Sequence, residues 1–534
     1  MKNRMWPWAL LSFLVLAVYF HGLGSYGFLD PDEGRYAEIP REMIESGDFV
    51  TPRLNYVKYF EKPVLHYWLT AGAFLLCGEN EFGGRLIPVL MGLGGCLLAF
   101  CVARRVTGNG RASWSSALML ATSILWYVLS RINLTDMTLT FFFTLALLGY
   151  RLWLDGEQRR WLLLFYAGMA LATLTKGLVG VVLPGGIAVL HLAFTRRWRS
   201  LPRLFSPLAI ALYFAITVPW FWAVCRANAD FFDFFFIREH LLRYLTTVHD
   251  RYEPVWFFIP IILAAFVPWT GMLWDAARAA FGKCALISRD DGIFLGLWAA
   301  LPFVFFSLSS SKLIPYILPC MPPAAVLIGA AMETADRRSV LCFIGLNAII
   351  LLPLALTGFL WPLFSTDLRV MSMISPALML SAGLLAFWGT SFLLLRGADW
   401  ARALLCLLGL LILFAVSPAF RIEANMLSRR DIAACVPEGA EDVVVYQSLM
   451  QGMPFYLGRR VVTADILNEL SFGAEQESDP RWFISKEQLH RLWASPRRVL
   501  VVVEDEDRDS LEQTLGKKPV RTWKAAGDVL FANF

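Results

Sequence analysis

The sequence predicts an α-helical polytopic membrane protein that ends in a small α/β domain. Of its 534 residues, 57% are hydrophobic and only 17% are charged, whereas soluble domains average about 45–50% apolar and about 25% charged residues. The apolar residues fall in runs of roughly 17–25, the length of helix that crosses a bilayer core of about 30 Å. From about residue 421 the composition changes to short β-rich runs between polar segments.

About 13 apolar runs are present, and each is expected to form one transmembrane helix. They lie at 6–24, 83–103, 112–130, 137–154, 161–175, 178–195, 204–225, 254–274, 292–308, 314–332, 339–362, 375–395 and 403–420. Lys and Arg cluster in alternate connections, which the positive-inside rule assigns to the cytoplasm together with Lys2 and Arg4. An odd number of spans then puts the C-terminus outside. No small-x-small cleavage site follows the first run, so we expect it to stay as an uncleaved helix.

Two long connections are expected on the outer, periplasmic side, at 25–63 and 226–253. In the first, a helix from Glu33 to Glu45 should end at a break at Gly47-Asp48. The aromatic stretch 63–77 is too short to span the membrane, and we expect it to lie along the interface as a helix. Residues 1–420 would thus form a transmembrane catalytic domain.

The tail, 421–534, carries β-rich runs at 443–446, 461–462 and 499–503, which are typical of a small soluble α/β domain. It has no Gly-rich phosphate loop and no pair of carboxylates in a recognisable motif. We therefore interpret this domain as a scaffold or a lid over a site in the membrane part.

Ionisable residues gather at the outer ends of the predicted spans, where they are costly unless they face a cavity with a partner. One Lys near a span end can be a simple membrane anchor, Asp32 can cap a helix that begins at Glu33, and His240 can be a structural histidine. Together, however, these cations and carboxylates favour a site for a phosphorylated substrate, because Lys and Arg bind phosphate and carboxylates handle reacting groups. A transporter would instead carry such residues near mid-membrane, often in repeated halves.

Several of these motifs resemble the signature of the aminoarabinose transferases, which move 4-amino-4-deoxy-L-arabinose from undecaprenyl phosphate to lipid A. The resemblance is carried by the segments DEGRYAEIPREM (32–43), SGD (46–48), PRLN (52–55), YFEKP (59–63), LTD (134–136), LTKG (174–177) and KLIPYILP (312–319). This family belongs to class C of the lipid-carrier-dependent glycosyltransferases and is related to the protein O-mannosyltransferases. The resemblance therefore implies a class C glycosyltransferase architecture.

The resemblance also implies roles for individual residues. The catalytic carboxylates would be Asp32 and Asp136. The carrier phosphate would be held by Lys62, Arg243 and Tyr316, with assistance from Lys176. Supporting positions would be Glu33, Arg35, Tyr36, Tyr59, Glu61, His240 and Lys312. In relatives, the residue at the position of Glu61 can ligate a metal, but Arg238 stands where some members have a histidine, so we expect no required cofactor and leave a divalent metal at Glu61 open.

The expected function is inverting transfer of aminoarabinose from undecaprenyl phosphate to a lipid A phosphate at the periplasmic face of the bacterial inner membrane. The alternative is a related glycosyltransferase that uses another polyprenyl-linked sugar, or a protein or glycan acceptor. The expected partners are the lipid-linked donor, lipid A and membrane lipids, without nucleic acid.

Overall fold

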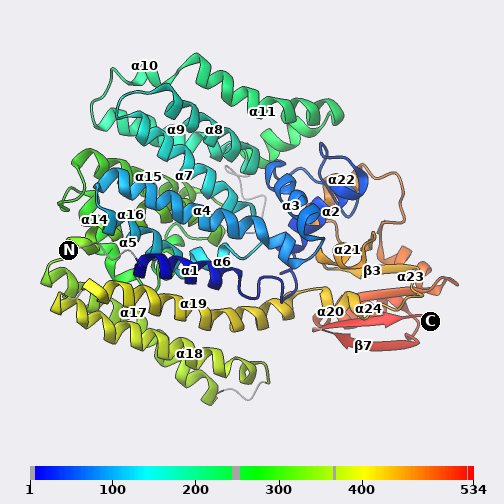
Figure 1. The fold of residues 1–534 in the computed structure, drawn as a ribbon. Helices are drawn as coiled ribbons and strands as arrows, with labels where there is room; N and C mark the ends of the chain where they lie inside the picture. The colour runs from blue at the N-terminus through cyan, green and yellow to red at the C-terminus, as the bar shows by residue number, and fades with distance from the viewer. Residues whose placement is uncertain (1–5, 243–252, 365–367, 398, 526) are drawn as a thin grey trace. The chain divides into compact units, whose positions relative to one another are not determined.

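The computed structural model describes residues 6–242, 253–364, 368–397, 399–525 and 527–534, without the side chains of 6–7, 239–242, 361–364, 368–372 and 399. The chain divides into two compact units (Figure 1). The helical unit comprises Met1–His21, Ile87–Arg131 and Thr135–Ala419. The mixed unit comprises Gly22–Leu86, Ile132–Leu134 and Phe420–Phe534.

Helices make up the helical unit almost entirely. They are α1 (Trp6–Phe20), α4 (Glu81–Thr107), α5 (Gly110–Ala121), α6 (Ile124–Leu129), α7 (Thr135–Trp153), α8 (Arg159–Lys176), α9 (Val179–Phe194), α10 (Leu201–Leu204), α11 (Pro207–Ala227), η1 (Asp233–Leu242), α13 (Phe258–Ala265), η2 (Thr270–Met272), α14 (Leu273–Ala280), α15 (Arg289–Leu308), η3 (Ile314–Cys320), α16 (Met321–Glu333), α17 (Arg337–Phe364), α18 (Leu368–Ser391), η4 (Phe392–Arg396) and α19 (Asp399–Leu427). The first residues of α4 and the last of α19 belong to the mixed unit.

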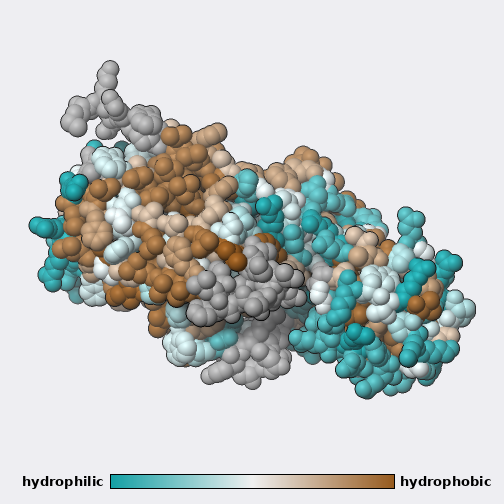
Figure 2. Space-filling view, turned by 90° about the horizontal axis from the view of Figure 1, so that it is seen from below, coloured by the Kyte–Doolittle hydropathy of each residue, from teal (hydrophilic) through white to brown (hydrophobic). Residues whose placement is uncertain are grey.

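Close helix packing holds this unit together, as in the pairs α7 with α8 and α17 with α18 (Figure 1). A Cβ added to Gly168 of α8 would lie 2.7 Å from the backbone nitrogen of Ala146 on α7. Only glycine permits this approach, and small residues at helix contacts are typical of membrane bundles. Apolar side chains gather on the helical part of the surface in Figure 2, whereas the part that carries the β-sheet is mainly hydrophilic.

The predicted fold class is confirmed in its helical character and in its C-terminal α/β region, but the number of about 13 spans is not confirmed. Among the described residues, seven helices are long and apolar enough to cross a membrane, or up to eight if one bent pair counts as a span. The predicted run 112–130 is interrupted between α5 and α6. The run 254–274 corresponds to helices that bend by 112° between Phe258–Ala265 and Thr270–Ala280. Two further runs, 6–24 and 178–195, form shorter apolar helices.

The mixed unit combines the first predicted outer segment with the tail. Its elements are α2 (Asp32–Ser46), β1 (Arg53–Leu54), β2 (Val57–Lys58), α3 (Leu65–Cys77), α20 (Arg430–Ala434), β3 (Asp442–Tyr446), α21 (Gly452–Leu457), β4 (Val462–Ala464), η5 (Asn468–Leu470), α22 (Ser471–Glu475), β5 (Phe483–Ile484), α23 (Lys486–Ala494), β6 (Val499–Glu504), η6 (Asp505–Asp507), α24 (Arg508–Leu515), β7 (Arg521–Ala525) and β8 (Asp528–Ala532).

A six-stranded sheet in the order β5-β4-β3-β6-β8-β7 forms the centre of the tail. The first four strands run parallel, and β8 pairs antiparallel with both β6 and β7. Buried Val and Leu side chains of β3 and β6 pack on both faces of the sheet. The three β-rich runs predicted from the sequence form β3, β4 and β6. The strand β7 was not predicted, because its sequence RTWKA is too polar to form an apolar run.

The first outer segment folds largely as its sequence predicts. Helix α2 covers Asp32–Ser46 and ends at Gly47, whose φ of 69° lies in the left-handed region that glycine adopts easily. The hairpin of β1 and β2 turns at Asn55 and Tyr56, both with positive φ, as a two-residue hairpin turn requires. The stretch predicted to be an interfacial helix forms α3. Its C-terminal residues Leu75 and Leu76 are exposed.

Candidate active site

Asp32, the predicted catalytic carboxylate, is the first residue of α2. Pro31 occupies the cap position and no side chain caps the helix, so the structure does not support a capping role for Asp32. Its side chain is 60% exposed, and its carboxylate lies 3.5 Å from the buried guanidinium of Arg35, one turn along the helix. A carboxylate at a helix N-terminus is favoured by the helix dipole. This arrangement leaves a charged carboxylate oriented by one cation and open on its other side.

Arg35 lies among aromatic rings. Its guanidinium carbon is 5.8 Å from the ring centres of both Tyr36 and Tyr59, a distance typical of cation–π contacts. Nearby in sequence, the ammonium of Lys62 lies 3.7 Å from the carboxylate of Glu61. The mixed unit therefore brings six of the predicted positions into two small ionic groups, Asp32 with Arg35 and its two rings, and Glu61 with Lys62.

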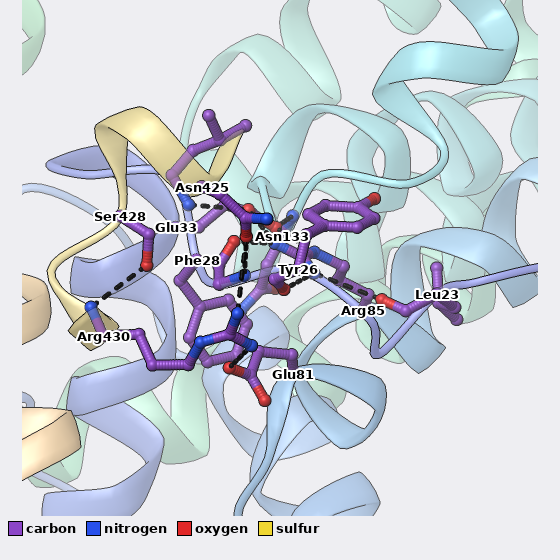
Figure 3. A network of polar contacts seen from close by, with 12 residues as sticks. Leu23, Tyr26, Phe28, Glu33, Glu81, Arg85, Asn133, Asn425, Ser428 and Arg430 are labelled. Atoms are coloured by element: carbon purple, nitrogen blue, oxygen red, sulfur yellow. Dashed lines mark hydrogen bonds and ion pairs between the residues drawn. The ribbon is translucent and has the colours of Figure 1, made fainter. Parts of the chain in front are cut away.

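Glu33 is fully buried and lies in a network of polar contacts with Arg85 (Figure 3). Its two carboxylate oxygens accept hydrogen bonds from Nε and Nη2 of Arg85 at 2.8 and 2.6 Å. They also accept the backbone N–H groups of Asn133, at 2.7 Å, and Leu29, at 2.9 Å. The remaining donors of Arg85 bind the carbonyl oxygens of Leu23, Tyr26 and Gly27. Glu33 thus has a structural role that fixes the segment just before α2.

A separate ionic group forms within the helical unit. Asp136, in the first turn of α7, pairs with Lys176, the last residue of α8, at 2.5 Å. The Lys176 ammonium also lies 4.4 Å from the ring centre of Tyr316. Gly177 follows with a φ of 82° and ends α8. Three predicted site residues, 40 or more positions apart in sequence, thus meet in one place.

The other predicted residues of the helical unit are not part of this group in the described contacts. Lys312 donates hydrogen bonds to the carbonyl oxygens of Glu253 at 2.7 Å and Ser309 at 2.6 Å. His240 lies in the π-helix η1, and its side chain is not described. Arg243 lies outside the described residues.

The described residues contain no group of three or more His, Cys, Asp or Glu side chains that could hold a metal ion. Glu61, the position named by the resemblance, has Lys62 beside it. The His240 side chain is not described. A divalent metal at Glu61 therefore stays an open alternative to the expectation that no cofactor is required.

Asp30 was not predicted as a functional position, yet it holds the start of α2. Its buried carboxylate accepts the backbone N–H of Gly452 at 2.5 Å and lies 3.4 Å from Nε of Arg429. A Cβ on Gly34 would come within 2.5 Å of the same Gly452 nitrogen, so α2 contacts α21 with no room for a side chain. Burial raises the pKa of Asp30 from 3.8 to about 6, and burial likewise raises the pKa of Asp528, which also pairs with Arg429, to about 6.

These two carboxyl groups predict a pH dependence of stability. A pKa raised in the folded state means that folding favours the protonated form, so this stabilisation is complete below about pH 4 and is lost as the pH rises through about 6. For Asp30 alone the change is about 3 kcal/mol at most, at about 1.4 kcal/mol per pKa unit. We expect the contribution of Asp30 to the melting temperature of the purified chain to fall between pH 4 and pH 6.5.

The matched variant is Asp30→Asn, which keeps an oxygen acceptor for Gly452 and cannot ionise. The melting temperature of the unchanged chain minus that of the variant should therefore fall from pH 4 to pH 6.5. Carboxyls with lowered pKa, such as Asp48 and Glu477, make stability rise as the pH increases toward about 5.5, but they are present in both chains and cancel in this difference. A difference that stays constant or rises with pH over this range would contradict the prediction.

Besides Asp30, sequence reasoning missed three residues that the structure connects to the predicted site or to Asp30. Arg85 binds Glu33, Arg429 binds Asp30, and Glu469 accepts a hydrogen bond from Arg35 at 2.9 Å. Of these three, only Arg85 could have been recognised from the sequence, because an arginine in the first turn of a predicted apolar span usually needs a charged or polar partner.

Comparison with known proteins supports the resemblance seen in the motifs. A family model described as dolichyl-phosphate-mannose-protein mannosyltransferase matches residues 7–235, and one described as aminoarabinose transferase C-terminal domain matches residues 432–523. The undecaprenyl phosphate-alpha-4-amino-4-deoxy-L-arabinose arabinosyl transferase of Edwardsiella ictaluri (strain 93-146) is 30% identical over 517 residues, which are 92% of each chain. The chain belongs to this arabinosyl transferase family. The predicted family resemblance is thereby confirmed.

Other members of the arabinosyl transferase family and their structures agree. Arabinosyl transferase 2 of Pseudomonas fluorescens (strain Pf0-1) is 36% identical over 359 residues, which cover 66% of this chain and 64% of the relative, just under two thirds of its length. The crystal structure of ArnT from Cupriavidus metallidurans bound to undecaprenyl phosphate superposes with a TM-score of 0.88 at 30% identity, covering 100% of this chain and 99% of that one. With seven or more apolar helices, this arabinosyl transferase family member is a multi-pass membrane protein.

Proposed function

We propose that the chain is an inverting glycosyltransferase that moves 4-amino-4-deoxy-L-arabinose from undecaprenyl phosphate to a lipid A phosphate. One observation carries the proposal: the chain aligns over 92% of the length of a relative with this donor in its name. The grouping of Asp136, Lys176 and Tyr316 adds support, because these residues belong to the motifs from which the resemblance was drawn.

In the proposed reaction, an oxygen of the acceptor phosphate attacks the anomeric carbon of the sugar. The bond between that carbon and the carrier phosphate breaks, and its electron pair leaves with undecaprenyl phosphate. Lys62, Arg243 and Tyr316, assisted by Lys176, would bind this phosphate and stabilise its developing charge. Attack from the face opposite the leaving group inverts the anomeric centre.

The acceptor decides what the carboxylates do. A lipid A phosphate is already ionised near neutral pH, so Asp32 would orient the sugar and acceptor or stabilise positive charge on the ring rather than remove a proton. Asp136, paired with Lys176, would keep that lysine in place. A hydroxyl acceptor would instead need a general base. No cofactor is required in this scheme, and a divalent metal at Glu61 would be an addition to it.

The site would face the periplasm in the inner membrane, with the N-terminus in the cytoplasm and the tail in the periplasm. This orientation follows from the distribution of Lys and Arg along the chain. Residues 1–420 would form the transmembrane catalytic domain, and 421–534 the soluble domain.

Mass spectrometry of lipid A from cells with and without the gene tests the proposal. A mass increment of one aminopentose that depends on the gene is expected. If lipid A is unchanged while another glycan or protein loses a sugar, the function is the related transfer to a different acceptor. The match of residues 7–235 to a protein mannosyltransferase model makes that second outcome the alternative to test.

A further inference from the structure

Glu469 brings a carboxylate from the tail to the first turn of α2. It belongs to the short helix η5, more than 400 residues away in sequence, and its side chain is only 12% exposed. Its Oε1 accepts hydrogen bonds from Nη2 of Arg35 and from Nε2 of Gln451, each at 2.9 Å. Its Oε2 lies 3.4 Å from the hydroxyl of Tyr59. Three donors therefore converge on this one carboxylate.

Arg35 links Glu469 to Asp32. The same Nη2 that binds Glu469 lies 3.5 Å from the Asp32 carboxylate. Because a guanidinium is planar, fixing one of its nitrogens and stacking it near two rings fixes its whole orientation. The Nε of Arg35 is buried and has no hydrogen-bond partner among the described residues. Arg35 therefore has one buried donor that no described residue uses.

We propose that Glu469 is a positioning residue of the transfer reaction, which holds Arg35 in the orientation that keeps Asp32 ready for catalysis. The inference rests on the proposed function and assigns the tail a part in the chemistry beyond that of a scaffold or a lid. The Glu469 charge balances Arg35, so that Arg35 can orient Asp32 without binding it at full strength. Without that balance, the cation would pair with Asp32 alone and draw its carboxylate away from the substrate.

The simpler explanation is that the pair of Arg35 and Glu469 only anchors the tail to the first outer segment. Other contacts already provide that anchor on both sides of Glu469. The Asn55 side chain makes two hydrogen bonds to the Val461 backbone, at 2.9 and 3.0 Å, and a Cβ on Gly473 would come within 2.6 Å of the Lys58 carbonyl oxygen. Loss of the Glu469 charge should therefore leave the backbone in place while it releases Arg35.

The test measures transfer kinetics of the full-length chain in detergent, with undecaprenyl phosphate-aminoarabinose as donor and lipid A as acceptor. The variant Glu469→Gln should lower kcat about tenfold or more, since small misplacements of catalytic groups have effects of this size, with little change in the donor KM. The variant Glu469→Asp keeps the charge and should recover part of kcat. The control Gln476→Ala removes a contact between the same segments, the 2.8 Å bond from Lys58, and should retain wild-type kcat.

A double-mutant comparison shows whether Glu469 acts through Arg35. On an Arg35→Gln background, Glu469→Gln should cause no further loss, because the group that it positions is gone. The inference is overturned if the two losses multiply, if Glu469→Gln raises KM at unchanged kcat, or if Gln476→Ala reduces kcat equally. Should Glu469→Gln not fold, the result for Glu469→Asp decides, since a kcat equal to wild type overturns the inference. An inactive unmodified chain instead overturns the proposed function itself, and the inference with it.

Discussion

The substitution Asp32→Asn is expected to lower the transfer rate by at least about a hundredfold, the size of effect that a positioned carboxylate supplies. Asparagine keeps the size and the hydrogen-bonding oxygen of the side chain but removes its charge. The charge is what Arg35 orients at 3.5 Å and what the exposed side of the carboxylate presents to a substrate. Binding of undecaprenyl phosphate should change little, because the proposed phosphate ligands are other side chains, namely Tyr316 and the cations of Lys62, Arg243 and Lys176.

The measurement pairs a transfer assay with a binding isotherm for undecaprenyl phosphate. The control is Glu79→Gln, which removes an exposed carboxylate of the same unit and should leave both values unchanged. Retained turnover in Asp32→Asn would refute the catalytic assignment. If carrier binding is lost and turnover falls only in proportion to that loss, Asp32 acts in donor binding and not in catalysis.

Local signals in the sequence predicted the local structure well. The break at Gly47, the helix before it and the helix 65–77 could be predicted because each depends on residues within a turn or two. The same is true of β3, β4 and β6, whose apolar runs are dense enough to mark buried strands. The number of spans could not be predicted in this way, because an apolar run such as 112–130 has the composition of a span whether or not a break divides it.

The contacts between site residues could not be predicted from the sequence, because they join residues that are far apart along the chain. Asp136, Lys176 and Tyr316 were predicted as site residues, but their contact depends on how α7, α8 and η3 pack. Nothing in the sequence around Glu469 distinguishes it from the nearby carboxylates Glu475 and Glu477. Its importance depends on the fold of the tail and of the β1–β2 hairpin, which no local pattern encodes.

The largest expected effect on stability concerns the pair of Glu33 and Arg85. Both side chains are fully buried, and the guanidinium donates to two carboxylate oxygens and three carbonyl groups. Its carbon also lies 3.8 Å from the ring centre of Tyr26. Breaking a buried ion pair by removing one partner costs about 3–5 kcal/mol, because the other charge remains buried without compensation. Arg85→Met should destabilise the chain by this amount.

Loss of Arg85 should also disturb the position of Asp32, because Asp32 is the residue directly before Glu33. With Arg85 absent, Glu33 keeps the N–H groups of Leu29 and Asn133, but three backbone carbonyl groups lose their donor, those of Leu23, Tyr26 and Gly27. Neutralising both partners, in Glu33→Gln with Arg85→Met, removes the uncompensated charge and should be less destabilising than the sum of the single changes. Chemical denaturation of the purified chain in detergent, followed for all three variants, measures this coupling.

An exposed arginine provides the matched control. Arg491→Met, on the surface of α23, removes the same charge and should change stability by no more than about 0.5 kcal/mol. If Arg85→Met were equally mild, the buried network in Figure 3 would not be what holds the chain before α2. Alternatively, Arg85→Met lowers stability while Glu33→Gln lowers turnover under conditions in which that variant is still folded. In that case the network has two effects. It maintains the fold of the segment and, through the backbone next to Asp32, the geometry of the reaction.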